Sequence, residues 1–405
     1  MSDSRVIQQA HRPAESMETD AIIFSTRKSS VSVILLMKIR IAQPYNDAEI
    51  ESSVLSVLRS GRLVSGPVVA SFEDAVAEYL GVKHVVAVNS GTAALHLALL
   101  ASDVKPGQEV ITTPFSFAAT ANTIIQTGAT PVFVDVDPGT YNIDPREIEK
   151  AVTARTLAIE PVHVFGEPAE MKPIQEIAGK HDLQIVEDAA EAIGAEYHGK
   201  KIGNTDMFAC FSTYATKNLH TGEGGFITTN NPDAAETLKI LRSQGQESKY
   251  RHVKLGYNYR MTEIAAAIGK VQIKKIDQFN RRRIENANHL THLIRDLAAL
   301  KPQVPIPNSK HVYYQYTVTL DEEEAGLARE ELQRSLAEAG IETDVHWPDP
   351  IHLQPWYRER YVYRPGMFPH AEELARTVLS IPIHPAVTRE QIEYISKTLH
   401  GTLSK

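Results

Sequence analysis

VVAVNSG (85–91), followed at once by TAALHLALLAS (92–102), is a β-branched run that turns at Gly91 into an apolar helical pattern. The same alternation of a short apolar run and a helical segment continues along the chain. Strands that are nearly all apolar and alternate with helices predict an α/β fold with a largely parallel central sheet, covered by helices on both faces. The last two runs are joined by a Gly-rich loop instead of a helix, so we expect one of them to be antiparallel. The further runs are EVITTP (109–114), PVFVDVD (131–137), TLAIEPVHVFG (156–166), QIVEDAA (184–190), MFACFST (207–213) and GGFITTN (224–230).

The pattern of the chain changes after about residue 275. Residues 274–300 read as one long helix with a polar face, and VYYQYTVTL (312–320) alternates like a half-buried strand. AREELQRSLAEAG (328–340) predicts an amphipathic helix that ends at Gly340. We therefore expect a disordered leader over 1–36, a large domain over 37–275 and a smaller α+β domain over 276–405.

The overall composition argues against several classes of function. The 405 residues are 42% hydrophobic and 23% charged, as in ordinary globular proteins. The net charge of −8 comes without the basic block that a nucleic-acid partner would require. One cysteine, Cys210, excludes an intrachain disulfide and fits a reducing compartment such as the cytoplasm. VSVILLM (31–37) is too short to span a bilayer, so we expect no membrane partner.

Several polar residues lie where predicted strands end, which is where open α/β sheets bind their ligands. Ser90, Gly91 and Thr92 end one strand and begin a helix, whose free N–H groups and partial positive charge suit a phosphate. A simple helix cap explains the same residues. At the end of a later strand, alternation sends Glu187 and Asp188 to opposite sides. Asp188 is suited to hold a protonated pyridine nitrogen, or to cap a helix.

FSTYATKNLHTGEGG (211–225) adds a lysine to these groups. Ser212 ends a strand within reach of a phosphate, and Lys217 follows in a loop of small and turn-forming residues. A lysine traps carbonyl compounds when partial burial and nearby cations lower its pKa. Most lysines simply lie on the surface. The order of a strand-end Asp, a strand-end Ser and a loop Lys favours the carbonyl-trapping role for Lys217.

Four blocks of the sequence together resemble the DegT/DnrJ/StrS sugar aminotransferases. These are fold-type-I enzymes that depend on pyridoxal 5'-phosphate (PLP), and the resemblance implies that fold and that cofactor. The blocks keep the family's order, and the resemblance runs from about Ile41 to Leu399. They are NSGTAALHLAL (89–99), IVEDAAEAIGAEYHGKKIG (185–203), FSTYATKNLHTGEGG (211–225) and GYNYRMTEIAAAIG (256–269).

The resemblance implies a role for each strand-end residue. Lys217 falls on the family's Schiff-base lysine. Asp188 falls on the carboxylate that pairs with the pyridine nitrogen of the cofactor. Gly91, Thr92 and Ser212 fall on the phosphate cradle, which agrees with the roles that the residues suggest by themselves.

Two further positions take their roles from the resemblance alone. Phe117 falls on the aromatic residue that stacks over the cofactor ring, although packing in the core also explains an apolar residue there. Asn258 falls on a residue that crosses a dimer interface to the phosphate of the neighbouring subunit. We therefore expect a homodimer with shared active sites.

The implied reaction moves an amino group from an amino acid, L-glutamate by family habit, to a keto sugar nucleotide. HTGEGG (220–225) resembles members that act on 4-keto sugars, whereas members acting on 3-keto sugars more often have Gly-Asp-Gly-Gly there. Glu191 either faces the substrate or packs at the rim of the core. Tyr314 and DVHWPDPIHLQPWY (344–357) are further substrate contacts that we expect. His163, in PVHVFG, is better explained as a packing residue than as a catalyst.

Three rival functions compete with this one. A dehydratase of the same fold removes a hydroxyl from a keto sugar, and its pyridoxamine-dependent members carry His where this chain has Lys217. A regulatory member would keep the fold without turnover, and the loss of Lys217 or Asp188 would favour that alternative, but both are present. A nicotinamide enzyme lacks support because no G-x-G-x-x-G follows the first strand.

Overall fold

The computed structural model describes residues 38–403, and the predicted leader over 1–36 lies outside them. Its central element is a seven-stranded sheet in the order β1-β9-β8-β5-β4-β2-β3. Neighbouring strands from β3 through β8 run parallel, whereas β9 is antiparallel to both β1 and β8. The α/β class, the largely parallel sheet and the antiparallel strand after the Gly-rich loop are confirmed. The strands are β1 (His84–Val88), β2 (Glu109–Thr112), β3 (Thr130–Phe133), β4 (Thr156–Ile159), β5 (Gln184–Asp188), β8 (Phe208–Ser212) and β9 (Gly225–Thr229).

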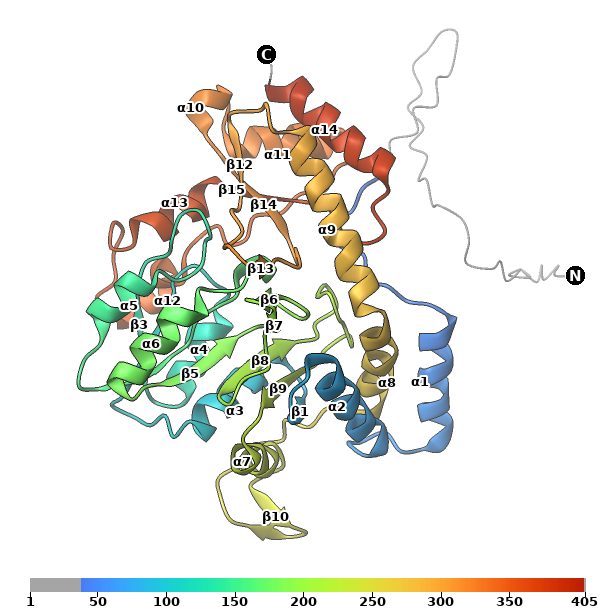
Figure 1. The fold of residues 1–405 in the computed structure, drawn as a ribbon, viewed down its shortest axis with the longest axis vertical. Coiled ribbons are helices and arrows are strands. Elements are labelled where there is room, and N and C mark those ends of the chain that lie inside the picture. The colour runs from blue at the N-terminus through green and yellow to red at the C-terminus, as the bar shows by residue number, and fades with distance from the viewer. Residues whose placement is uncertain (1–37, 404–405) are drawn as a thin grey trace, which may run out of the picture.

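Helices cover both faces of this sheet, which is why its strands are apolar on both sides (Figure 1). One face carries α3 (Gly91–Ala101), α4 (Ala119–Gln126) and α7 (Pro232–Arg242). The other carries α2 (Pro67–Leu80), α5 (Pro145–Ala151), α6 (Met171–His181) and α8 (Glu263–Gln272). α3 is buried around most of its circumference, as its apolar sequence requires.

The start of α3 is positioned by its own sequence. Ser90 is the N-cap, and its hydroxyl accepts a hydrogen bond from the Ala93 N–H at 3.1 Å. Gly91 follows, where the helix comes into direct contact with the end of β8 at Ser212. The N–H groups of the first helical turn therefore lie at the carboxyl edge of the sheet.

The C-terminal part of the chain forms a second, antiparallel sheet in the order β12-β14-β15. Its strands are β12 (Leu300–Pro302), β14 (Tyr316–Leu320) and β15 (Val378–Ile381). The helices α9 (Ile276–Leu293), α11 (Arg329–Glu338) and α14 (Arg389–Leu403) share one hydrophobic core with it. Figure 1 shows α9 running from α8 to this sheet. The placing of a domain boundary at residue 275 stays a prediction.

Two predicted elements of this part differ in the structure. The helix expected over 274–300 ends at Leu293, because the chain then turns so that Ile294 and Leu297 pack into the C-terminal core before β12 begins. The strand expected over 312–320 begins only at Tyr316 and is almost wholly buried. It is the middle strand of its sheet, so the half-buried alternation was the wrong reading of it.

Shorter elements complete the fold. Within residues 38–403, no helix is long and apolar enough to cross a membrane. The remaining helices are α1 (Ala48–Ser60), α10 (Glu322–Ala325), α12 (Pro355–Arg360), α13 (Pro369–Thr377) and the 3-10 turns η1 (Val164–Gly166), η2 (Ile273–Lys275) and η3 (Ile351–Leu353). The remaining strands are β6 (Glu196–Tyr197), β7 (Lys200–Lys201), β10 (Gln246–Ser248), β11 (Arg251–His252) and β13 (Ser309–Lys310).

Candidate functional site

A cavity of about 780 Å³ opens at the carboxyl ends of β5 and β8, beside the start of α3. Segments far apart in the sequence line it, from Ile41 near the beginning of the described chain to Trp347 in the C-terminal part. Six of the seven predicted site residues meet here, and they are Gly91, Thr92, Phe117, Asp188, Ser212 and Lys217.

The contact between Gly91 and Ser212 forms a small concave surface. A Cβ atom on Gly91 would lie 2.9 Å from the Ser212 Cβ and 3.3 Å from its Oγ, so a larger residue would push the strand end away. The first N–H groups of a helix have no acceptor within the helix. Gly91 and Thr92 contribute such groups, and Ser212 adds a hydroxyl. Ser90 is the residue that caps the helix, as one of the two interpretations predicted. The N–H groups of Gly91 and Thr92 remain available to bind an anion.

Asp188 lies at the end of β5 and is only 5% exposed. Its Oδ2 accepts a hydrogen bond from the Thr120 hydroxyl at 2.8 Å, and its Oδ1 accepts one from the Ala190 N–H at 3.2 Å. The Ser116 and Thr120 hydroxyls are 2.7 Å apart, and Thr120 gives its proton to Asp188, so Ser116 donates to Thr120. Burial raises the pKa of Asp188 above its usual value, against these hydrogen bonds, which lower it.

The two adjacent carboxylates of β5 have different surroundings, as the alternation predicted. Glu187 lies on the other face of the sheet, where its Oε2 is 3.1 Å from the Nε2 of the fully buried His163. The Ala169 N–H donates to the His163 Nδ1, so the proton of the neutral ring is on Nε2 and points to Glu187. His163 does not line the cavity, in agreement with a packing role.

Lys217 extends from the loop after β8 into the cavity. Its Nζ donates to the Glu191 Oε1 at 3.0 Å and lies 4.1 Å from the centroid of the Tyr314 ring. Burial by itself would lower the pKa of Lys217, but the charge and hydrogen bond of Glu191, with further contributions from Tyr314 and Asp188, raise it. The expectation that nearby cations lower this pKa is therefore wrong for the described structure, in which a carboxylate contacts the amino group.

The mouth of the cavity is aromatic. Phe117 is 63% exposed, which excludes packing in the core of this chain as the explanation for it. Tyr214, 47% exposed, also lines the mouth, and the sequence reasoning did not identify it. Tyr314 and residues 344–347 line the cavity too, whereas residues 348–357, the rest of the segment predicted to contact substrate, do not.

The sequence reasoning also missed three side chains near Asp188. Ser116 lies in the bend just before α4 and Thr120 in its first turn, and their spacing of four residues was the only sequence signal that they could meet. Glu160 follows β4 and is fully buried, and neither of its carboxyl oxygens has a hydrogen-bond partner among the described residues. Burial and the charge of Asp188 raise its pKa well above the usual value. Burial and the nearby carboxylate of Asp188 thus both disfavour the ionised form of Glu160.

Asn258 does not line this cavity. It is an exposed residue between the β10–β11 hairpin and α8, and its carbonyl accepts a hydrogen bond from the Asn89 side chain at 3.4 Å. The described chain thus brings six of the predicted site residues together and leaves the seventh on its surface.

These groups fit PLP. The concave surface at Gly91 and Ser212 suits a phosphate, because a Cβ at Gly91 would obstruct it. Asp188 makes no ion pair within residues 38–403, and a protonated pyridine nitrogen would supply the missing positive charge. Lys217 presents the amino group that reacts with an aldehyde, and Phe117 offers a flat apolar surface at the mouth.

Comparisons with known proteins agree with this arrangement. The model of the DegT/DnrJ/EryC1/StrS aminotransferase family matches residues 44–400. The chain is 42% identical to a pleiotropic regulatory protein of Geobacillus stearothermophilus, over 84% of this chain and 90% of the relative. It is 36% identical to the UDP-2-acetamido-2-deoxy-3-oxo-D-glucuronate aminotransferase of Pseudomonas aeruginosa, over 87% and 95% of the two chains. The crystal structure of S. venezuelae DesV in complex with a ketimine intermediate superposes with a TM-score of 0.85 at 38% identity, covering 88% and 95%.

Proposed function

The chain belongs to the DegT/DnrJ/EryC1/StrS aminotransferase family and is a PLP-dependent transaminase, and from this premise we propose that it aminates a keto sugar nucleotide. The observation that carries the proposal is the meeting of Lys217, Asp188 and the Gly91–Ser212 contact in one cavity. A reactive amine, a buried carboxylate and a surface that accepts a phosphate are the features by which a protein holds PLP.

The residues of the cavity divide the work of transamination. PLP, when bound, supplies an aldehyde that takes up the amino group and a ring that stabilises the negative charge left on the donor's α-carbon. We assign its phosphate to the N–H groups of Gly91 and Thr92 and to the Ser212 hydroxyl. Lys217 takes the proton from the α-carbon of the donor as general base and returns a proton as general acid. Asp188, held by its two hydrogen bonds, keeps the proton on the ring nitrogen.

The substrate assignment rests on relatives and on one loop. The Pseudomonas relative is named for a UDP-sugar substrate, which supports a sugar nucleotide as the amino acceptor. L-Glutamate is our choice of donor, by the habit of the family. The HTGEGG loop supports a 4-keto acceptor, and its Glu223 lines the cavity. A 3-keto acceptor is the second candidate, because the same relative is named for a 3-oxo sugar.

A panel of 3-keto and 4-keto sugar nucleotides, each incubated with glutamate and the PLP-loaded protein, tests this assignment. Amination replaces a ketone oxygen by an amine, and mass spectrometry detects the change. We expect conversion of a 4-keto member of the panel, with 2-oxoglutarate formed in equal amount. Conversion of 3-keto members alone would overturn the 4-keto assignment, and glutamate consumption with no aminated sugar would overturn the substrate class.

Two alternatives keep the same fold. A keto-sugar dehydratase would remove a hydroxyl group, and a non-catalytic member would act in regulation, as the name of the Geobacillus relative suggests for that protein. A pyridoxamine-dependent dehydratase would carry His at position 217, and a regulatory member would have no need of a lysine in contact with reacting atoms. The position of Lys217 beside Glu191, inside the cavity that holds Asp188, favours turnover by transamination.

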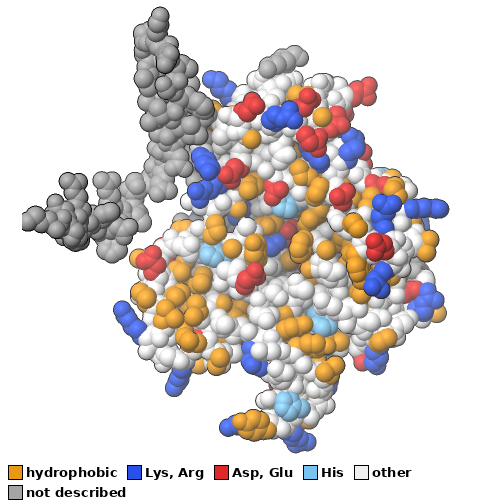
Figure 2. Space-filling model, turned by 180° about the vertical axis from the view of Figure 1, so that it is seen from behind, with side chains coloured by type: hydrophobic (Ala, Val, Ile, Leu, Met, Phe, Trp, Pro, Cys, Tyr) orange, Lys and Arg blue, Asp and Glu red, His pale blue; other side chains and the backbone are white. Residues whose placement is uncertain are grey.

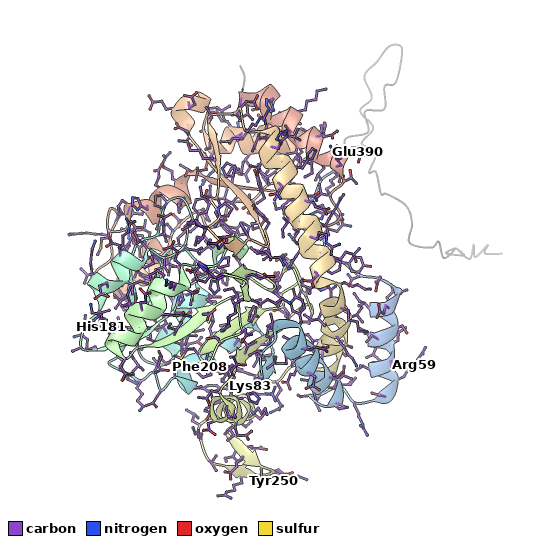
Figure 3. The ribbon with its side chains drawn as sticks, viewed as in Figure 1. Arg59, Lys83, His181, Phe208, Tyr250 and Glu390 are labelled. Carbon is purple, nitrogen blue, oxygen red and sulfur yellow. The ribbon has the colours of Figure 1, made fainter. Side chains whose placement is uncertain are left out.

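We further propose that two copies of the chain share their active sites. The loop after α1 and the outer side of that helix expose Leu55, Leu58, Leu63 and Val64, and Val64 is 76% exposed. Figure 2 shows hydrophobic side chains gathered on the side of the molecule where α1 lies, which is typical of a protein interface. Tyr250, 80% exposed, lies at the tip of the hairpin that projects just before Asn258 in the sequence (Figure 3).

Mixed dimers test the sharing of sites. In the proposed dimer, Asn258 binds the phosphate in the partner's site, so Asn258→Asp opposes that phosphate with a negative charge. Loss of a hydrogen bond to a charged group costs about 1.5–3 kcal/mol, and the added repulsion weakens PLP retention further. A dimer of one Lys217→Ala chain and one Asn258→Asp chain holds one site with both residues intact. Activity should therefore reappear on mixing two inactive homodimers, measured after subunit exchange is confirmed. No recovery would mean that Asn258 serves its own chain or only packs.

A further inference from the structure

Lys217 lies between Glu191 and Tyr314, and both of these residues form a hydrogen bond with the backbone of Phe165. The Lys217 Nζ contacts the Glu191 Oε1 at 3.0 Å on one side and the Tyr314 ring on the other. The Phe165 N–H donates to the second oxygen of Glu191 at 2.8 Å, and the Phe165 carbonyl accepts from the Tyr314 N–H at 2.8 Å. Lys217, Glu191, Phe165 and Tyr314 thus form a closed frame of contacts.

Further contacts restrain the residues of this frame. Phe165 has a φ of +59°, a left-handed conformation that a bulky side chain rarely adopts and that persists only when its surroundings impose it. The Tyr314 hydroxyl is 2.9 Å from the Thr216 Oγ1, one residue before Lys217. The buried Arg283 donates to the Tyr313 and Tyr314 carbonyls at 3.3 and 3.1 Å. The position of the amino group is therefore determined by the fold before any ligand enters.

We propose that Glu191 is the positioning residue of Lys217, and that in the cofactor-free protein it holds the amino group as an ammonium between itself and Tyr314. The proposal rests on the proposed function for the reaction that Lys217 performs. The ammonium itself can be measured without any cofactor.

The charges around Lys217 support this role. The side chains of Lys217 and Glu191 are 14% and 9% exposed, so their attraction is weakly screened by water. Burial lowers the pKa of Lys217, and Glu191 more than offsets that effect together with Tyr314 and Asp188. An ammonium is not a nucleophile, so removal of the Glu191 charge should shift the formation of the free amine to lower pH. The other titratable side chains that line the cavity are Asp188, Tyr214, Glu223, Tyr314, Asp344 and His346.

Competitive acetylation of the full chain, freed of PLP, measures this shift. Acetic anhydride reacts only with the free amine, so the labelling of the Lys217 peptide against pH gives a midpoint by mass spectrometry. Glu191→Gln keeps the shape and the acceptor for the Phe165 N–H but removes the charge. We expect its midpoint at least about one pH unit below that of the wild type, and about tenfold faster capture of PLP at neutral pH. Glu191→Ser, which removes the side-chain carboxylate altogether, should shift the midpoint in the same direction.

Two matched variants separate charge from shape. Glu191→Asp retains a carboxylate, and its midpoint should lie closer to the wild-type value than that of Glu191→Gln. Glu223→Gln removes a charge from the same cavity without a direct contact to Lys217, and its midpoint should stay at the wild-type value. A midpoint that coincides in the wild type, Glu191→Gln and Glu191→Ser would overturn the inference. A shifted midpoint with no reaction between Lys217 and PLP would leave it standing and overturn the proposed function instead.

Discussion

Lys217→Ala is expected to lose more than about 10⁴-fold in turnover while keeping its fold. Lys217 is assigned both the covalent hold on PLP and proton transfer at the donor's α-carbon, and an alanine provides neither. The loop keeps its backbone hydrogen bond from the Lys217 N–H to the Tyr214 carbonyl. Glu191 loses its ion-pair partner, but it borders the cavity, where water takes the place of the ammonium. Steady-state kinetics measures the loss of turnover, and thermal melting monitored by circular dichroism checks that the fold is kept.

The chain offers a matched control for the lost lysine. Lys201 also lies over a tyrosine ring, with its Nζ 3.7 Å from the centroid of Tyr79, and it donates to the Tyr79 carbonyl at 2.6 Å. It does not line the cavity. Lys201→Ala should therefore melt earlier but turn over at the wild-type rate. If Lys217→Ala retains turnover comparable to that of Lys201→Ala, the catalytic role of Lys217 is wrong.

Asp188→Asn is expected to lower kcat by about 10²–10³-fold, the usual effect of removing one electrostatic group from an active site. The amide keeps the shape of the side chain and one acceptor for the Thr120 hydroxyl, but it lacks the charge that holds the ring proton. Retention of PLP should change much less, because the contact of Gly91 with Ser212 is untouched. Turnover is compared with the dissociation constant of PLP, measured by absorbance.

Glu187→Gln is the control for this variant. Glu187 is the neighbouring carboxylate on the same strand, but it faces His163 on the other side of the sheet. A glutamine there still accepts from the His163 Nε2, so we expect a small change in stability and none in kcat. Asp188 would be only a structural residue if Asp188→Asn turned over as fast as Glu187→Gln.

The parts of the site that the sequence could predict are those that depend on strand ends. The carboxyl ends of parallel strands lie along the same edge of the sheet, so side chains that follow these strands lie near one another independently of the rest of the fold. Asp188, Ser212 and the start of α3 at Gly91 could therefore be placed together from local patterns. The opposite orientation of Glu187 followed from the period of two along a strand, and the structure confirms it.

The contacts around Lys217 could not be predicted in this way. The Phe165 N–H donates a hydrogen bond to the Glu191 carboxylate and so orients it toward Lys217. Phe165 itself has a positive φ, which a phenylalanine side chain does not favour. The Tyr314 ring reaches the same amino group from the C-terminal part of the chain. Such contacts depend on the packing of distant segments and have no local signal. The role of Asn258 in a partner's site stays a prediction, since it concerns a second chain.

Borohydride reduction of the PLP-loaded protein, followed by peptide mapping, tests most directly the central claim that Lys217 bonds to the cofactor. Reduction fixes the bond between PLP and its lysine and removes the visible absorbance of the bound cofactor. We predict that the absorbance is bleached and that the pyridoxyl group is found on the peptide that contains Lys217, and not in the Lys217→Ala variant. A pyridoxyl group on any other lysine, or no stable adduct at all, would contradict the assignment of this cavity as a PLP site.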